Sequence, residues 1–404
     1  MPADGNGENR NVVDIAHRSA INPASARDAA TPRVRNSSPL IPLTSVDEDQ
    51  WQSLAARAIE PNGYYLPGWE RAVSATARGR TGASALRALD ASSRLIGLMP
   101  VVSLWRAYRI PLPALVSAHP YGTLCSPPLD RNAAHEAAGQ LLEQARAAGA
   151  RALILRDIAL DGAAMQALTD VSARDGVAPR VLSSYSRAAL DATEDSETLL
   201  RSAMGTKKLK ELRRQRHRLE EHGPVSFDVA RTPDEVGAAL ETFLQLEASG
   251  WKGKRGTALV QHDGDAAFIR RAVRALAETS QCEIITLRTG ATSVAAGIVL
   301  RHQHRAFFFK LGIDENFARF SPGVQLTVEL TRHLCADATI TSADSTASAD
   351  HPMINPIWRG RLAIGDVLLP LRRNDPVVAI IHAALAAHAG ALDLARRAVH
   401  LIRK

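Results

Sequence analysis

The alternation of apolar and polar positions predicts a mixed α/β arrangement in the first half of the chain. Apolar runs at 85–89 and 95–102 flank a polar turn, a pattern typical of a β-hairpin. Beyond the hairpin, amphipathic helical spacing alternates with short apolar runs, as in a domain whose strands and helices follow one another in turn. The expected helices cover residues 47–59, 131–148 and 163–175, and the expected strands cover 152–155 and 180–190.

The second half repeats this kind of order. Thr232 and Pro233 are a capping residue and a first helical residue, so a helix is expected from there to residue 250. Three apolar runs joined by short polar turns then predict a β-meander. The full set is strands at 225–229, 282–287, 294–300, 306–313 and 338–343, with helices at 232–250, 265–278 and 321–335. We therefore expect two similar domains with mixed sheets, residues 43–195 and 196–372.

Residues 1–42 differ from the body that follows. Arginines and acidic residues are scattered there among Pro, Ser, Asn and Ala, a composition that favours a flexible leader. No apolar core follows a charged start, so a secretory signal is not expected, and the acidic residues weaken a transit-peptide interpretation. We expect a cytoplasmic protein.

Residues 373–404 predict a C-terminal amphipathic helix that begins at Asp375 and Pro376. Its uncharged stretch to Leu392 is rich in Ala and interrupted by His382 and His388, so it is expected to be too weak to cross a membrane. Packing on the body is the simplest interpretation. The alternative is docking on a protein or at the periphery of an anionic membrane through the basic residues Arg396, Arg397, Arg403 and Lys404.

Composition narrows the class of protein. The chain has 404 residues, 46% of them hydrophobic, which suits two ordinary domains. The three cysteines have no metal-like spacing, so neither a disulfide framework nor a metal site is expected. The net charge of +7 is concentrated in residues 207–218, either a solvated helix face or a seat for a polyanion. This stretch has no aromatic residue to stack on bases, so sequence-specific nucleic-acid binding is disfavoured.

Four short blocks carry a resemblance to a known family. They are Gly250-Trp251-Lys252-Gly253 followed by Gly256-Thr257-Ala258, then Leu311-Gly312-Ile313-Asp314, then Phe320-Ser321-Pro322-Gly323, and finally Asp350-His351-Pro352-Met353-Ile354 leading to Trp358. In this order they resemble GNAT-fold acyltransferases of the CelD/BcsL type, associated with cellulose and exopolysaccharide production. The chain is more distantly similar to Fem-type aminoacyltransferases. Aromatic turns near Tyr64 and Tyr121 extend the resemblance into the first half.

The resemblance implies two tandem GNAT-like domains and a transferase activity. The acyl group would pass from a thioester, usually acyl-CoA such as acetyl-CoA, to an amine or hydroxyl. The acceptor would be a small molecule or a glycan precursor for the cell envelope or an exopolysaccharide. No metal is implied.

The start of the helix at 321–335 is a candidate phosphate site. Ser321 can cap it and Pro322 can be its first residue, so free backbone N–H groups beside Gly323 would face an anion. The GNAT phosphate loop usually has a basic or amide residue ahead of small residues, and Arg319 is the candidate for that position. Arg319, Ser321 and Gly323 are therefore the expected cofactor-binding residues, with a plain helix start as the alternative.

Acyl transfer also needs groups that move protons and stabilise charge. Asp344 and His351 lie at a strand end and in the loop after it, and Lys310 and Asp314 lie four residues apart on the preceding strand, so these are the catalytic candidates. A surface or capping role is the alternative for each. The acceptor is expected to contact Trp251, Lys252, Tyr64 and Tyr121. All five tyrosines fall in the first half, so a tyrosine acid would have to reach across from that domain.

Two rival functions stay open. An aminoacyl-tRNA donor is suggested by the basic segment, although the long helical-hairpin insertion common in Fem-type members is not visible in the sequence. A non-catalytic, GNAT-fold component of a polysaccharide synthesis complex is suggested by the departures at Pro322 and Val324 from the usual phosphate loop and by the missing second-half tyrosine.

Overall fold

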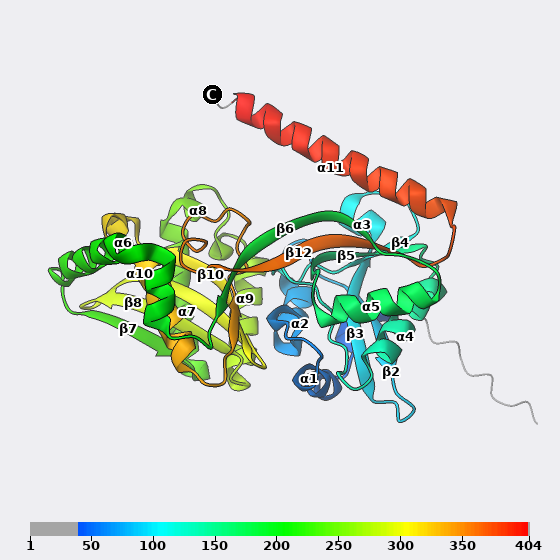
Figure 1. Cartoon of the computed structure of the whole chain (residues 1–404), viewed down its shortest axis with the longest axis horizontal. Coiled ribbons are helices and arrows are strands. Elements are labelled where there is room, and N and C mark those ends of the chain that lie inside the picture. The colour runs from blue at the N-terminus through cyan, green and yellow to red at the C-terminus, as the bar shows by residue number, and fades with distance from the viewer. Residues whose placement is uncertain (1–38, 403–404) are drawn as a thin grey trace, which may run out of the picture. The chain divides into compact units, whose positions relative to one another are not determined.

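The computed structural model describes residues 39–402, and in this part of the chain all twelve strands join in one sheet. The strand order is β1-β2-β3-β4-β5-β12-β6-β11-β10-β9-β8-β7. Figure 1 shows the first-half strands and the second-half strands as two groups, joined by the arched strands β6 and β12. Most of the predicted leader lies outside the described residues, while its last two residues, Ile41–Pro42, form β1 and pair with β2.

The first half is built as its pattern predicts, with short additions. The predicted hairpin is confirmed as the antiparallel pair β2 and β3. Short helices not expected from the sequence are α2, which begins with Pro67 at its first position, and α3. The bounds are α1 Glu48–Ala56, α2 Pro67–Thr76, β2 Ser84–Leu89, β3 Leu95–Ser103, α3 Leu104–Tyr108, β4 Ala114–Ser117, α4 Ala134–Ala147, β5 Ala152–Ala159, α5 Ala163–Arg174 and β6 Arg180–Asp191.

The second half confirms the predicted meander of β8, β9 and β10. Helix α7 starts with a full capping box between Thr232 and Glu235, which explains why its start could be read from the sequence. The bounds are α6 Ser196–Glu220, β7 Val225–Ala230, α7 Pro233–Ser249, α8 Trp251–Lys254, η3 Leu259–Gln261, α9 Asp263–Glu278, β8 Cys282–Thr289, β9 Thr292–His302, β10 Arg305–Ile313, η4 Glu315–Phe320, α10 Pro322–Ala336, β11 Ser342–Asp344 and β12 Gly360–Pro370.

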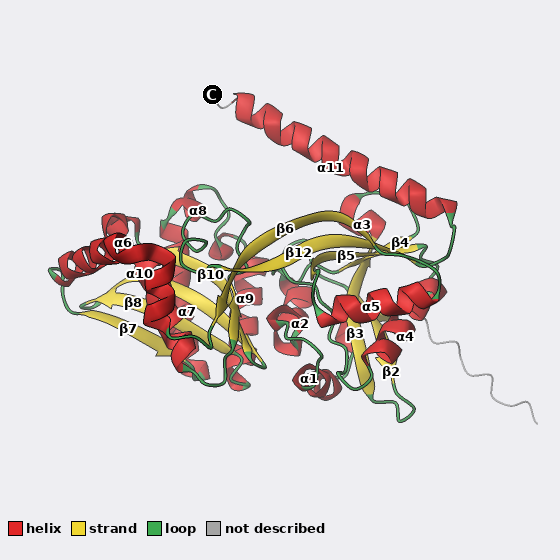
Figure 2. Ribbon diagram, in the orientation of Figure 1, coloured by secondary structure: helices red, strands yellow, loops and turns green. Residues whose placement is uncertain are grey.

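The last strand, β12, crosses back to the first half. By chain order it follows the second half, yet it lies between β5 and β6 and pairs antiparallel with both. Strand β6 pairs with β12 along most of its length and with β11 at its end, from Ala189 to Asp191. The two halves therefore share strands at their junction, and Figure 2 shows helices packed along the strands of both.

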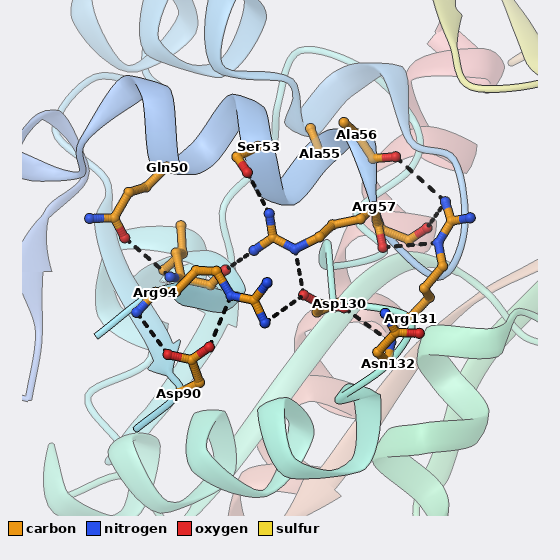
Figure 3. A network of polar contacts seen from close by, with 12 residues as sticks. Gln50, Ser53, Ala55, Ala56, Arg57, Asp90, Arg94, Asp130, Arg131 and Asn132 are labelled. Atoms are coloured by element: carbon orange, nitrogen blue, oxygen red, sulfur yellow. Dashed lines mark hydrogen bonds and ion pairs between the residues drawn. The ribbon is translucent and has the colours of Figure 1, made fainter. Parts of the chain in front are cut away.

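A polar network fixes α1 against the first-half strands (Figure 3). The guanidinium of Arg57 donates to the buried carboxylate of Asp130 at 2.5 Å and to the carbonyl of Leu95 at 2.7 Å. Arg94 pairs with Asp90 across the hairpin turn at 2.9 Å. Burial raises the pKa of Asp130, but the two arginines outweigh burial, so the pKa is lowered on balance. The end of α1 also meets the second half, because the side chain of Gln303 donates to the carbonyls of Ala55 and Ala58.

The C-terminal helix starts at Pro376 as predicted and runs to Ile402, forming α11. Asp375 accepts the N–H of Val377 at 3.0 Å and pairs with Arg151 at 2.8 Å, which fixes the start of the helix on the body. By length and composition alone, the segment Pro376–Ala395 is long and apolar enough to cross a membrane, with a mean hydropathy of 1.7. This differs from the expectation that the stretch is too weak.

Candidate functional site

A cleft opens where two parallel strands of the second half separate. Strands β10 and β11 pair only over Arg305–Phe307 and Ser342–Asp344, and beyond these residues they diverge. At the point of divergence β10 shifts its register against β9, between Phe308 and Lys310, which turns the backbone locally. A cavity of about 430 Å³ lies along this opening. It is large enough for the arm of a thioester cofactor or a comparable small ligand.

The cavity combines an apolar wall with a few polar groups. Its apolar lining comes mainly from β10 and from the segment after β11. The polar residues and glycines around it are Glu247, Gly250, Lys252, Lys310, Gly312, Ser321, Gly323, Ser345, Thr346 and His351. Five of the expected site residues are therefore brought together here: Lys252, Lys310, Ser321, Gly323 and His351.

The strongest electrostatic feature of the cavity is a carboxylate held between two ammonium groups. One Glu247 oxygen, Oε1, accepts from Lys252 at 3.1 Å and from Lys310 at 3.2 Å, and the other accepts the N–H of Leu259 at 2.9 Å. Burial pushes the pKa of Glu247 upward, but the two lysines outweigh it and lower the pKa on balance. Burial lowers the pKa of Lys252. One negative and two positive charges leave this wall with an excess of positive charge.

His351 faces the same cavity from the loop after β11. Its Nδ1 lies 3.5 Å from the backbone N of Ile354, too far to fix which ring nitrogen carries the proton. Burial lowers the pKa of His351, so the imidazole is largely neutral at pH 7. A neutral imidazole can accept a proton from a nucleophile.

The start of α10 lines the cavity through Ser321, Pro322, Gly323 and Val324. Ser321 takes the N-cap position in a left-handed conformation, with φ at 53°, and its side chain makes no capping bond. In this 15-residue helix the N–H groups of the first turn have no acceptor within the helix. Pro322 is its first residue and has no N–H group. A Cβ on Gly323 would lie 3.0 Å from Leu311 and 3.2 Å from Met353, so glycine keeps this end of the cavity open.

Thr346 connects the two diverging strands at the point where they part. It has a φ of 50°, which is strained for a β-branched residue. Its N–H donates to Asp344 at 2.8 Å and its hydroxyl donates to the carbonyl of Phe308 at 2.7 Å. The hydroxyl of Thr123 donates to its carbonyl at 3.2 Å. These bonds hold the register shift of β10 at the wall of the cavity.

Asp344 is placed beneath the cavity lining rather than on it. Its carboxylate is fully buried and pairs with the buried guanidinium of Arg187 on β6, at 2.5 Å. Arg187 also donates to the carbonyl and hydroxyl of Thr123, at 2.5 and 2.8 Å. Burial lowers the pKa of Arg187, but the Asp344 carboxylate raises it by more, so the pKa is raised on balance. The pair supports Thr346 from below, which fits a positioning role for both residues.

The two expected tyrosines lie behind the cavity. Tyr64 is fully buried against Trp69 and Phe307, and burial raises the pKa of its hydroxyl. Tyr121 reaches the second half: its hydroxyl donates to Asp265 on α9 at 2.9 Å, and Lys310 Nζ lies 6.0 Å from its ring. Burial, with the Asp265 carboxylate, raises the pKa of Tyr121. Neither residue is among those that line the cavity.

Three other expected site residues have different placements. Asp314 caps η4 by accepting the N–H of Asn316 at 2.9 Å, so it serves the turn before α10. The guanidinium of Arg319 lies 4.6 Å from the ring centre of Phe320 and lines a second, smaller hollow with Arg218 of α6. Trp251 begins α8, and its side chain lies outside the described part of the structure.

The corresponding opening in the first half is filled by the chain itself. Strands β4 and β5 are also parallel and pair only over three residues, from Ala114 to Val116 on β4. The next segment folds into the gap, where the Tyr65 hydroxyl donates to the carbonyl of Ala118 at 2.8 Å and the Cys125 N–H donates to that of Asp157 at 3.1 Å. The cleft of the second half is therefore the candidate active site. The described residues contain no group of three or more His, Cys, Asp or Glu that could hold a metal ion.

Sequence reasoning missed Glu247, Arg187 and Thr346. Glu247 follows Val236, Leu240 and Phe243 on the buried face of α7, and a carboxylate in an apolar stripe was a readable signal. Arg187 lies in a strand with no marked pattern, and its partner is 157 residues away. Nothing local to the sequence indicates the left-handed backbone at Thr346.

Comparison with protein families identifies the segment that carries the cleft. Residues 206–351 match the family model described as an acetyltransferase (GNAT) domain, and they include Glu247, Lys252, Lys310 and His351 of the cavity. This part of the chain is therefore similar to GNAT acetyltransferase domains. A comparison with curated protein sequences gives no match.

Two solved structures share the fold of the whole body. One is the C-terminal domain (DUF2156) of a putative lysylphosphatidylglycerol synthetase from Agrobacterium fabrum, with a TM-score of 0.52 and 14% identity over 84% of this chain and 95% of that one. The other is FemX, with a TM-score of 0.54 and 12% identity over 83% of this chain and 98% of that one. The predicted mixed α/β architecture with tandem GNAT-like halves is thus confirmed.

Proposed function

We propose that the protein transfers an acyl group from acyl-CoA to an amine or hydroxyl of a cell-envelope or exopolysaccharide precursor. The observation that carries the proposal is the single cleft in which the diverging strands β10 and β11, the start of α10 and His351 meet. The match of residues 206–351 to a GNAT domain supports acyl transfer as the class of reaction. The choice of acyl-CoA and of the acceptor rests on the sequence resemblance.

In this proposal the donor lies along the separated strands. The pyrophosphate takes the free N–H groups at the start of α10, beside Gly323 and Val324, because a helix N-terminus favours negative charge. Its thioester reaches the shifted backbone of β10 near Phe308 and Lys310, where a main-chain N–H polarises the carbonyl. Arg218 and Arg319, which line the hollow on the other side of Phe320, are available for an outer phosphate.

His351 carries the proton transfers in this proposal. Its neutral imidazole takes the proton that the attacking amine or hydroxyl loses as the new C–N or C–O bond forms. The C–S bond then breaks, and the imidazolium gives its proton to the departing thiolate. The His351 side chain is thereby neutral again at the end of the reaction. Lys252 and Lys310 face the acceptor, and the net positive charge of their wall favours an acceptor that carries an anionic group.

The test is release of free thiol from acyl-CoA by the purified full chain, with amino-sugars, amino acids and sugar phosphates as acceptors. We expect turnover that falls by about 10²-fold or more in His351→Ala, the usual contribution of a proton-transferring side chain. His135→Ala is the matched control, because His135 lies exposed on α4 and pairs with Asp170. Wild-type protein that neither binds CoA nor releases thiol would refute the proposal and favour a non-catalytic role.

A second candidate donor is an aminoacyl-tRNA, because α6 presents an exposed cationic surface. Lys207, Lys210, Arg214 and Arg218 follow one another at helical spacing and are exposed, and Arg214 pairs only with Glu211 in the same helix among the contacts described. The two structural neighbours named above bear on the fold alone. Binding of tRNA that persists at 0.2 M salt would favour this donor, since contacts with phosphates alone weaken steeply as salt rises.

A further inference from the structure

Helix α11 leaves the body with most of its surface uncovered. Its first turns are packed, because Val378 and Ile381 are buried in a cluster with Leu104 of α3 and the ends of β4 and β5. The ring of His388 lies edge-on to Tyr108, with ring centres 5.3 Å apart. Beyond His388, every residue of the helix whose burial is described is exposed. Figure 1 shows this part of α11 extending past the strands that its first turns cover.

The exposed surface of α11 carries no charged residue from Pro376 to Leu392, and charged residues appear only in its last turns. Only 17% of the segment Pro376–Ala395 is buried, and its mean hydropathy is 1.7. Ile380, Leu392 and Leu394 are 55%, 46% and 70% exposed. Exposed apolar side chains gathered on one element mark a surface that contacts a partner or a membrane. We therefore expect a partner or a membrane to cover this apolar surface of α11 in the cell.

The neighbouring surface of the body has the character of a membrane interface. Trp105, on α3, is 51% exposed although it is a large aromatic residue. Arg106 and Arg109 beside it are exposed as well, and the Arg109 guanidinium lies 5.7 Å from the Trp105 ring centre. Tryptophan with flanking cations is the combination enriched where a protein meets lipid headgroups. Helix α3 shares its apolar cluster with α11, so both belong to one face.

The sequence at the end of this helix is mainly basic. From Pro376 to Leu392 the sequence of α11 has no charged residue, and Asp393 is paired with Arg397 at 2.7 Å. The chain then continues with Arg396, Arg403 and Lys404, while Arg106 and Arg109 add cations at the other end. An apolar helix flanked by cations is complementary to a bilayer that carries anionic headgroups.

We propose that α11 and Trp105 dock the protein on the surface of a bilayer containing anionic lipids. The helix lies on the bilayer and does not cross it, because Val378, Ile381 and the His388 contact hold its first turns against a folded body. A helix surrounded by lipid would have to break this packing. The proposal stands independently of the acyl-transfer activity, since none of these residues lines the cleft.

The experiment is flotation of the full chain with vesicles of phosphatidylcholine alone or with about one third phosphatidylglycerol. We expect flotation only with the anionic vesicles, reduced several-fold by 0.5 M salt and by Leu394→Glu. Trp105→Ala should weaken it as well. Val260→Glu is the matched control, since Val260 is an exposed apolar residue on η3 of the second half, and it should float like the wild type.

Three outcomes would overturn the proposal. They are no flotation with anionic vesicles, flotation that Leu394→Glu and Val260→Glu reduce equally, and resistance of the bound protein to extraction at high pH, which would show a spanning helix. A wild-type dimer in light scattering that Leu394→Glu makes monomeric, without vesicle binding, would instead assign the helix to a second copy of the chain. Circular dichroism of each variant checks that it is folded.

Discussion

Replacing Asp344 by Asn tests whether this residue supports the cleft or performs chemistry in it. The carboxylate and its partner Arg187 have side chains 1% and 0% exposed, so neither can be rehydrated without opening the fold. Asparagine keeps an oxygen for the N–H of Thr346 but presents a neutral group to the guanidinium, which leaves a buried cation without its counter-charge. Breaking such a pair costs about 3–5 kcal/mol of unfolding free energy.

The lower part of that range applies here. Arg187 keeps its bonds to the carbonyl and hydroxyl of Thr123, so part of its hydrogen bonding survives the substitution. We expect Asp344→Asn to lose about 3 kcal/mol, measured by urea unfolding with circular dichroism and tryptophan fluorescence as separate probes. The double replacement Arg187→Met with Asp344→Leu should be more stable than Asp344→Asn, because it removes the unpaired charge along with its partner.

Asp314→Asn is the control, since this half-exposed carboxylate only caps η4 and asparagine caps about as well. It should change the unfolding free energy by less than about 0.5 kcal/mol. The reasoning is refuted if Asp344→Asn unfolds at the wild-type urea concentration. If that stable variant also lost thiol release, Asp344 would be a catalytic residue, as its place at a strand end suggested from the sequence.

Three further predictions concern single side chains. Gly122→Ala would drive a Cβ into the buried ring of Tyr64, so we expect poor soluble expression or a destabilisation above about 3 kcal/mol, measured by thermal unfolding. Gly323→Ala would press on Leu311 at 3.0 Å and narrow the cleft, so calorimetry should show weaker CoA binding with unfolding unchanged; unaltered affinity would argue against a donor at this helix end. Burial raises the pKa of Glu70 well above its usual range, so the folded state holds a proton that the unfolded state loses above about pH 4.5. Above that pH, the unfolding free energy of the wild type should therefore fall by up to about 1.4 kcal/mol per pH unit relative to that of Glu70→Gln. If the unfolding free energies of the two proteins depended on pH in the same way, this prediction would be wrong.

The repeating order of strands and helices could be predicted because most elements carry their own signals. Helix α7 has a capping box, and the β8–β10 meander has three clear apolar runs. Strand β12 was not predicted, because the register shift between Gly365 and Val367 interrupts its alternation. The strand expected at 338–343 is shorter and begins later, at Ser342–Asp344. Only these three residues pair with both β10 and β6.

The candidate site was predictable to the extent that its residues occur in short sequence blocks. Lys252, Ser321, Gly323 and His351 come from such blocks and meet in one cleft. Asp344 shows the limit of this reasoning, because a strand end does not reveal whether a carboxylate faces a ligand or a buried arginine. That distinction depends on Arg187, which only the three-dimensional pairing of β6 with β11 brings close.

The position of β12 has a consequence for how the chain is made. Strands β5 and β6 are complete once residue 191 has been synthesised, but the strand that separates and pairs them is not available until residue 370. During this interval of roughly 180 residues, two unpaired strand edges of the first half stay open to other chains. At translation rates of about 5–20 residues per second, that exposure lasts on the order of 10 to 40 seconds. A shortened chain that ends before Gly360 would keep both edges open permanently, so truncation at the apparent boundary between the halves is expected to give aggregation, not an isolated first domain.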